Sequence, residues 1–118
     1  MLVREIVELL DCEVCCGAQK LDTEVRSACG ADMMSDVLAF VREHSVLLTG
    51  LVNLQVVRTA EMMDIRCIVF VRGKEPDAAL IERAEESGLI VLKSKFRMYP
   101  ACGTLYAHGL KGGELIHG

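Results

Sequence analysis

The clearest pattern of hydrophobic and polar positions lies between residues 45 and 73. Residues 45–49 form an apolar run that ends at a Thr-Gly pair, and residues 66–71 form a β-branched run that ends at Gly73. Between the two runs, Asn53 occupies the position of a helix N-cap. The apolar residues that then recur at helical spacing are Val56, Val57, Ala60 and Met63. Two buried strands joined by an amphipathic crossover helix are typical of a βαβ unit with parallel strands.

The chain before this unit predicts two helices and two short strands. The first helix covers residues 2–10, and strands at 13–16 and 24–29 follow on either side of a turn at 18–22. We expect these two strands to form a hairpin-like flap. The second helix covers roughly residues 33–43, with Asp32 or Ser35 as its cap. Its inward-facing residues are expected to be Val37, Leu38 and Val41.

The chain after the unit predicts a helix, a third core strand and a last helix. Pro76 suits the first position of the helix, and Gly88 is the expected stop. The apolar stripe of that helix is formed by Leu80, Ile81 and Ala84. The strand covers residues 89–92 and the last helix residues 96–110. Residues 111–118 bury little and are predicted to be a flexible tail, which leaves one domain over residues 1–110.

Composition indicates a globular domain and excludes several classes of protein. The 118 residues are 52% hydrophobic and 25% charged, enough for an ordinary core. The net charge is −4, the basic residues are scattered along the chain, and there is no Trp, so nucleic-acid binding is not expected. No apolar run reaches the ~18–20 residues of a membrane span. The acidic N-terminus lacks the layout of a signal peptide, which predicts a cytoplasmic location.

The cysteines raise the question of metal or redox chemistry. Six are present, beside six methionines, a content that fits an anaerobic host. Cys12, Cys15 and Cys16 form a cluster that could bind a metal or exchange disulfides, but no second Cys-x-x-Cys pair exists. On a strand, Cys12 and Cys16 would face one side and Cys15 the other, so small buried thiols are the favoured interpretation. No metal or other cofactor is expected.

Two polar groups are candidates for a ligand site. Asp32 and Asp36, four residues apart on a predicted helix face with Ser35 beside them, suit a hard metal or acid–base chemistry, although a helix cap is favoured. The second group lies at the carboxyl ends of the three core strands, which meet at one sheet edge if the strands are parallel. It contains Thr49, Gly50, Asn53, Gly73, Lys74, Ser94 and Lys95. These residues predict an anion or phosphate pocket, with ordinary turn chemistry as the alternative.

No catalytic constellation can be assembled from the sequence, so the chain is not expected to be an enzyme. There is no Walker-type or Gly-x-Gly-x-x-Gly motif and no Ser/His/Asp or Cys/His pairing. The histidines, His44, His108 and His117, lie where surface positions are expected.

The order of motifs resembles the stand-alone DRTGG-domain proteins over nearly the whole chain. The matching segments are ADMMSDVLAFV (31–41), VLLTGLVNLQVVRTAEMMDI (46–65), IVFVRGKEPD (68–77), AEESG (84–88) and VLKSKFRMYPACGTLY (91–106). Such proteins are similar to the N-terminal domain of HPr kinase/phosphorylase, and the resemblance implies a three-layer α/β/α fold. The sequence departs from the family at residues 51–53, where Leu-Val-Asn replaces an expected Asp-Arg pair.

The resemblance implies regulation rather than catalysis. DRTGG domains occur as regulatory modules in pyrophosphatases with CBS domains, where they help to bind adenine nucleotides, and stand-alone versions accompany hydrogenase and electron-transfer genes of anaerobes. We therefore expect a non-catalytic regulatory or adaptor domain that senses an adenine nucleotide or another phosphate-bearing small molecule. The alternatives are a metal- or redox-linked accessory protein with a hydrogenase or electron-transfer partner, and a homodimerisation module without a ligand.

Overall fold

The computed structural model describes residues 1–42 and 44–112, without the side chain of Phe40. Its helices are α1 (Val3–Leu9), α2 (Met34–Phe40), α3 (Leu54–Met62), α4 (Ala78–Glu86) and α5 (Met98–Ala107), with a short 3-10 helix, η1 (Ala18–Lys20). Its strands are β1 (Glu13–Cys16), β2 (Ser27–Gly30), β3 (Ser45–Thr49), β4 (Ile65–Phe70) and β5 (Ile90–Lys93). Most of the predicted tail, including His117, lies outside the described residues.

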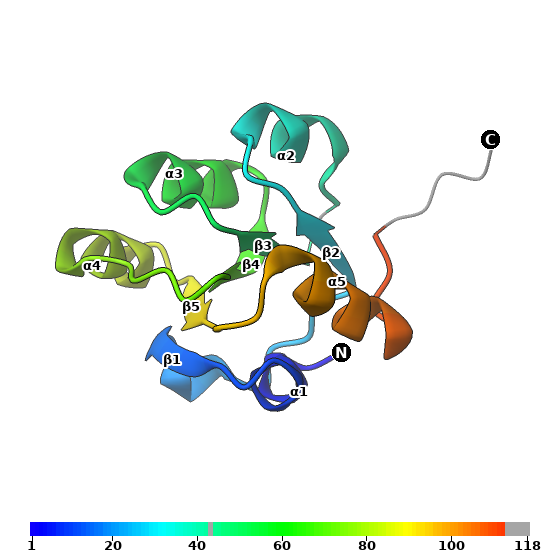
Figure 1. The fold of residues 1–118 in the computed structure, drawn as a ribbon. Coiled ribbons are helices and arrows are strands. Elements are labelled where there is room, and N and C mark those ends of the chain that lie inside the picture. The colour runs from blue at the N-terminus through cyan, green and yellow to red at the C-terminus, as the bar shows by residue number, and fades with distance from the viewer. Residues whose placement is uncertain (43, 113–118) are drawn as a thin grey trace.

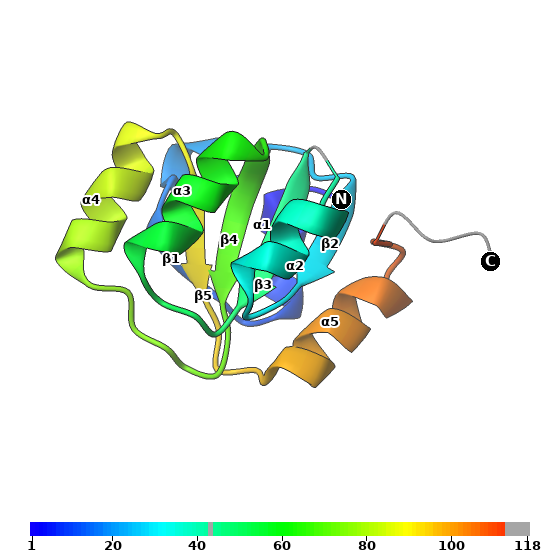
Figure 2. The same ribbon diagram turned by 90° about the horizontal axis from the view of Figure 1, so that it is seen from above.

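The five strands form one sheet in the order β1-β5-β4-β3-β2. Strands β2 to β5 run parallel, and only β1 is antiparallel to its neighbour, β5. Strand β3 is buried along its whole length, as expected of a parallel strand covered on both faces. The predicted mainly parallel α/β fold is thereby confirmed (Figure 2).

The predicted N-terminal flap is wrong, because β1 and β2 lie at opposite edges of the sheet (Figure 1). The segment between them pairs with the start of the chain instead. The N–H groups of Val3 and Arg4, in the first turn of α1, donate to the carbonyls of Thr23 and Leu21 at 2.9 and 2.8 Å. The first N–H groups of a helix have no partner within it, so this segment supplies their acceptors.

The helices cover the sheet in two layers (Figure 1). Consecutive parallel strands joined by crossovers of the same hand place α2, α3 and α4 on one face, around a core of Leu47, Ile68 and Phe70. Helices α1 and α5 cover the other face, around Val46, Val69 and Leu92. The three-layer arrangement is therefore confirmed. No helix in the described part of the chain is long and apolar enough to cross a membrane.

Helix ends follow local hydrogen bonding. Asn53 caps α3 as predicted, since its side chain accepts from the N–H of Val56 at 3.2 Å. Helix α4 begins two residues later than predicted, because the carboxylate of Asp77 caps it by accepting from Leu80 N–H at 2.9 Å. Gly88 ends that helix with a φ of 74°. The cap position of α2 is Met33, so neither Asp32 nor Ser35 caps it, and Leu38 is 46% exposed rather than inward.

Candidate functional site

The carboxyl ends of β2, β3, β4 and β5 meet at one edge of the sheet, because these strands are parallel. Asp32 follows β2, Thr49 and Gly50 end β3, Arg72 follows β4, and Ser94 follows β5. This is the edge at which the sequence predicts a ligand pocket. Its polar side chains form two neighbouring groups, one centred on Asp32 and one on the loops after β4 and β5.

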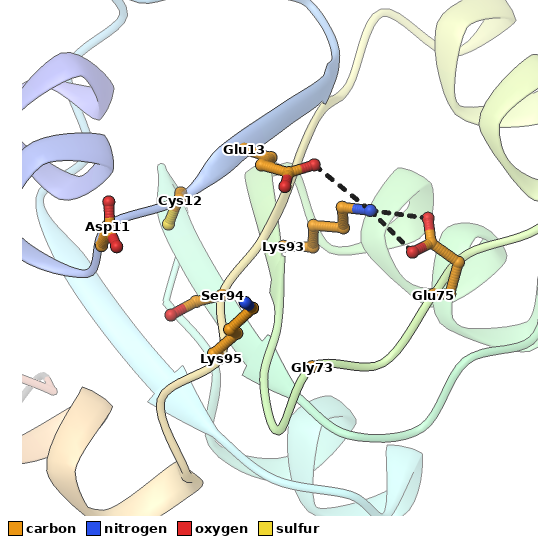
Figure 3. A pocket seen from close by; sticks show the side chains of 8 residues that line it. All are labelled: Asp11, Cys12, Glu13, Gly73, Glu75, Lys93, Ser94 and Lys95. Carbon is orange, nitrogen blue, oxygen red and sulfur yellow. Dashed lines mark hydrogen bonds and ion pairs between the residues drawn. The ribbon is translucent and has the colours of Figure 1, made fainter.

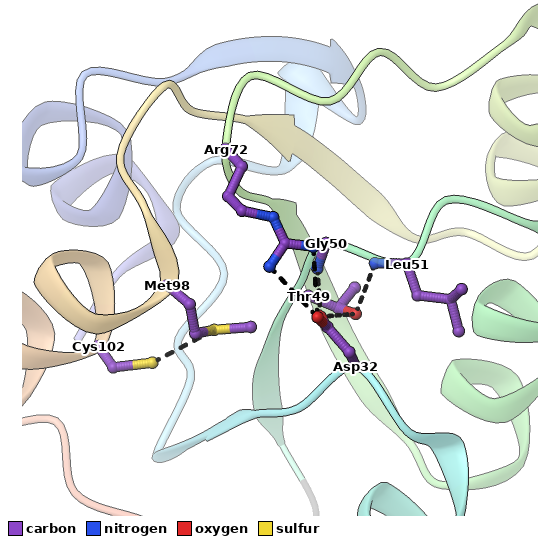
Figure 4. A network of polar contacts seen from close by, with 7 residues as sticks. All are labelled: Asp32, Thr49, Gly50, Leu51, Arg72, Met98 and Cys102. Carbon is purple, nitrogen blue, oxygen red and sulfur yellow. Dashed lines mark hydrogen bonds and ion pairs between the residues drawn. The ribbon is translucent and has the colours of Figure 1, made fainter.

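Asp32 joins the ends of three strands (Figure 4). Its Oδ1 accepts from the backbone N–H of Gly50 at 2.7 Å and from the hydroxyl of Thr49 at 3.3 Å. Its Oδ2 accepts from both terminal nitrogens of Arg72 at 3.3 Å. The Gly50 N–H and the Arg72 guanidinium stabilise the charged form and lower the pKa of Asp32, in spite of partial desolvation.

Arg72, which sequence analysis missed, has an unusual backbone. Arg72 and Gly73 have φ values of 64° and 67°, and the Lys74 N–H donates to the Val71 carbonyl at 3.3 Å, the arrangement of a type I′ turn. A non-glycine residue in this region costs about 1–3 kcal/mol. The ion pair with Asp32, whose two side chains are 40% and 45% exposed, contributes about 0.2–1 kcal/mol. Stability alone therefore does not explain an arginine here.

Gly50 allows the guanidinium to approach the backbone. A Cβ at Gly50 would lie 1.9 Å from Nη2 and 2.4 Å from Cζ of Arg72, so the arginine occupies the space of the missing side chain. The Asp-Arg pair expected at residues 51–53 is absent from the sequence. A carboxylate and a guanidinium nevertheless meet beside Gly50, supplied by residues 40 positions apart.

Several predicted ligand-binding groups are already engaged within the protein. The hydroxyl of Thr49 accepts from Leu51 N–H at 3.1 Å in addition to its bond to Asp32. The buried Ser94 hydroxyl donates to the Leu10 carbonyl at 2.7 Å and accepts from Phe96 N–H at 3.1 Å. The Asn53 side chain caps α3. The side chains of Thr49, Ser94 and Asn53 thus make hydrogen bonds that stabilise the local turns and a helix end, which is what the turn-chemistry alternative predicts for them.

The proposed grouping of Asp32 with Ser35 and Asp36 on a helix face is wrong. Asp32 lies before the N-cap of α2, while Ser35 and Asp36 are exposed in its first turn. The carboxylate of Asp32 is held by β3 and β4 residues instead. Among the described residues, no group of three or more His, Cys, Asp or Glu side chains could hold a metal ion.

Four cationic residues gather where the loops after β4 and β5 run side by side. Arg72 N–H donates to Phe96 O at 2.7 Å, and Gly73 N–H donates to Ser94 O at 2.9 Å. We call the exposed basic residues of these two loops, Arg72, Lys74, Lys95 and Arg97, the cationic rim. These four side chains carry +4 in a chain whose net charge is −4. Asp32 offsets part of this charge through its ion pair with Arg72, and the exposed Glu75 and Asp77 follow Lys74 in the same loop. Four of the 13 basic residues of the chain therefore lie on two loops that run side by side at this edge.

A pocket of about 370 Å³ adjoins the rim (Figure 3). It is lined by Asp11, Cys12, Glu13, Gly73, Glu75, Lys93, Ser94 and Lys95. Within it, Lys93 Nζ pairs with Glu75 at 2.6 Å and with Glu13 at 3.3 Å, and these carboxylates raise the pKa of Lys93. Three carboxylates against two ammonium groups make the pocket a poor anion site by itself. Lys95 belongs to both the pocket and the rim.

The cysteine cluster is divided between the two faces of the sheet. Cys12 packs on the core under α1 and α5, whereas Cys15 and Cys16 pack on the opposite core. The expected alternation fails because the register of β1 shifts between Val14 and Cys16. Burial raises the pKa of each thiol, that of Cys12 to about 12. Such thiols are weak nucleophiles and suit the favoured interpretation as small buried hydrophobic groups.

Comparison with known proteins agrees with this fold. The family model of the DRTGG domain matches residues 5–105. Among solved structures, the chain is similar to the CBS and DRTGG domains of the regulatory region of Clostridium perfringens pyrophosphatase, in complex with its activator diadenosine tetraphosphate. The TM-score is 0.74 at 14% identity, over 95% of this chain and 48% of that one.

The chain thus spans about half the length of the pyrophosphatase chain, and at this identity the likeness shows the fold alone. No curated protein matches the chain in sequence. The family model covers most of the chain, including all of the sheet and the edge that carries Asp32 and the cationic rim. The chain belongs to the DRTGG-domain family.

Proposed function

We propose that this chain is a non-catalytic regulatory domain that binds an adenine nucleotide or a related phosphate-bearing small molecule at the carboxyl edge of its sheet. The cationic rim is the observation that carries the proposal. The four exposed cations attract phosphate oxygens, even though Arg72 is paired with Asp32, and the net negative charge of the rest of the chain makes this attraction local to the rim.

The pocket beside the rim supports a nucleotide rather than free phosphate. At about 370 Å³ it is within the size range of small-molecule sites. The carboxylates of Asp11, Glu13 and Glu75 are acceptors, which suit ribose hydroxyls or the amino group of a base. A phosphate group held by Lys95 and Lys74 would place the attached nucleoside next to these acceptors.

The similar pyrophosphatase structure supports the adenine nucleotide as the first ligand to test, because that regulatory region was solved with diadenosine tetraphosphate. Binding here would act on a protein partner, since a regulatory domain transmits its ligand state to another domain or chain.

A thermal-shift screen of the protein against AMP, ADP, ATP, diadenosine tetraphosphate and inorganic phosphate tests the proposal. A ligand at ten times its Kd stabilises the native state by about 1.4 kcal/mol, which raises the melting temperature by roughly 5 °C. The shift should be smaller in Lys74→Ala and Lys95→Ala. Arg58→Ala, which removes one exposed charge from α3, is the matched control and should respond like wild type. A flat screen with every nucleotide would reject the ligand class.

A further inference from the structure

The contact between Arg72 and Asp32 lacks the usual paired geometry of a guanidinium and a carboxylate. A guanidinium usually meets a carboxylate through two parallel bonds, one to each oxygen, at about 2.7–2.9 Å. Here both terminal nitrogens share Oδ2 at 3.3 Å, because Oδ1 is held by Gly50 N–H at 2.7 Å. Within the described part of the chain, Nε of Arg72 makes no hydrogen bond. The arginine therefore retains much of its capacity to bind oxygens.

An oxyanion with two adjacent free oxygens would fit this guanidinium better than Asp32 does. The side chain of Arg72 is 40% exposed, so a ligand can reach it. Asp32 need not leave when the ligand arrives, since its bonds to Gly50 and Thr49 use the other oxygen. Only the long contacts to Oδ2 are exchanged. The unfavourable backbone conformation of Arg72 is also explained if its side chain serves a ligand rather than stability.

We propose that Arg72 is the oxyanion-recognising residue of the cationic rim and that Asp32 occupies its guanidinium until a phosphate group replaces it. This inference rests on the proposed function and identifies the residue that binds the phosphate group. Asp32 acts as an internal competitor, which lowers the affinity for the anion and sets the orientation of the empty guanidinium.

Titration of the protein with inorganic pyrophosphate, by calorimetry and by NMR of the arginine Nε–H signals, tests the inference. In wild type, the Nε–H signal of Arg72 should shift in a saturable way. Asp32→Asn keeps an acceptor for Gly50 N–H but removes the competing charge, and should tighten binding by roughly two- to fivefold. Arg72→Gln should abolish the binding, and Arg72→Lys, which keeps the charge without the planar fork, should weaken it.

Asp64→Asn is the matched control, because Asp64 pairs with Arg66 at the other end of β4, with side chains 53% and 42% exposed. It should leave the affinity for pyrophosphate at the wild-type value, and circular dichroism verifies that each variant is folded. Wild-type affinity in Arg72→Gln with reduced affinity in Lys74→Ala would overturn the inference and leave the proposed function standing. Unchanged or weaker binding in Asp32→Asn would also overturn it. An absence of pyrophosphate binding to wild type and Asp32→Asn alike would also overturn the inference, and a flat nucleotide screen beside it would reject the proposed function as well.

Discussion

Gly17 and Gly73 both have left-handed backbone conformations, with φ values of 86° and 67°, but their surroundings differ. A Cβ at Gly17 would lie 2.9 Å from Cα of Ile90, a backbone atom of a core strand, whereas a Cβ at Gly73 would meet nothing within 4 Å. Glycine is therefore required at position 17 by both conformation and space, and at position 73 by conformation alone.

We expect Gly17→Ala to lower the free energy of unfolding by about 2–4 kcal/mol, the sum of backbone strain and overpacking. Gly73→Ala should lower it by only about 1–2 kcal/mol. Urea denaturation of the two variants measures the difference. Equal losses in both would show that the contact with Ile90 relaxes without cost.

The charge state of Asp32 should affect how the free energy of unfolding depends on pH. The Gly50 N–H and Arg72 hold the pKa of this carboxyl below its ordinary value of 3.8, so ionised Asp32 stabilises the folded state above that pH. The contribution is lost as the pH falls through the lowered folded-state pKa. The difference in unfolding free energy between wild type and Asp32→Asn should thus be constant near neutrality and shrink between about pH 5 and pH 2. A difference that stays flat over this range in urea titrations would contradict the assignment.

At the scale of single elements, the capping residues are the sharpest test. Asn53 accepts from the third residue of α3, and Asp77 does the same for α4. Asn53→Ala and Asp77→Ala should each cost about 1 kcal/mol of stability. Ser35→Ala should stay within about 0.5 kcal/mol of wild type, since Ser35 is exposed and caps nothing. Chemical denaturation separates these outcomes, and a loss in Ser35→Ala equal to that of Asn53→Ala would reassign the cap of α2.

The elements of the core were predictable because their signals are local. Apolar runs, an Asn at the N-cap position and a Gly after α4 each act within a few residues. Strands β3 and β4 and helices α3 and α4 therefore begin within about two residues of their predicted positions. The partner of a short strand is not a local property. Strand β1 pairs with β5, for example Glu13 with Lys93, and the segment before β2 supplies carbonyls to α1, so the predicted flap does not form.

At the scale of the whole molecule, the six cysteines should behave as one class. Burial raises the pKa of every thiol, including that of fully buried Cys67. Iodoacetamide reacts with thiolates, so labelling of the folded protein at pH 8 should be slow at all six positions. The same reaction in guanidinium chloride, followed by mass spectrometry, should be fast and complete. Rapid modification of Cys12 or Cys15 in the folded protein would revive the redox alternative.

For the candidate site, the positions of most residues could be predicted from the sequence, but their contacts could not. Thr49, Gly50, Gly73, Lys74 and Ser94 were predictable as residues at strand ends, because parallel strands bring their carboxyl ends to one edge. The roles of these residues were not predictable, since the hydroxyls of Thr49 and Ser94 already donate hydrogen bonds to Asp32 and to the Leu10 carbonyl. Nothing in the sequence marked Arg72 as a site residue apart from its place in a Val-Arg-Gly-Lys turn.

By itself, the sequence determined the α/β class, the parallel core and the edge at which polar loops meet, because hydrophobic period and capping chemistry are read over short stretches of chain. The tertiary structure alone decided which charges share space. It decided that Asp32 pairs with Arg72, that the cysteines pack on two different faces of the sheet, and that the residues of the cationic rim lie on adjacent loops. None of these contacts can be inferred from the positions of the residues along the sequence. Such contacts depend on strand order, strand register and the packing of side chains around the whole sheet.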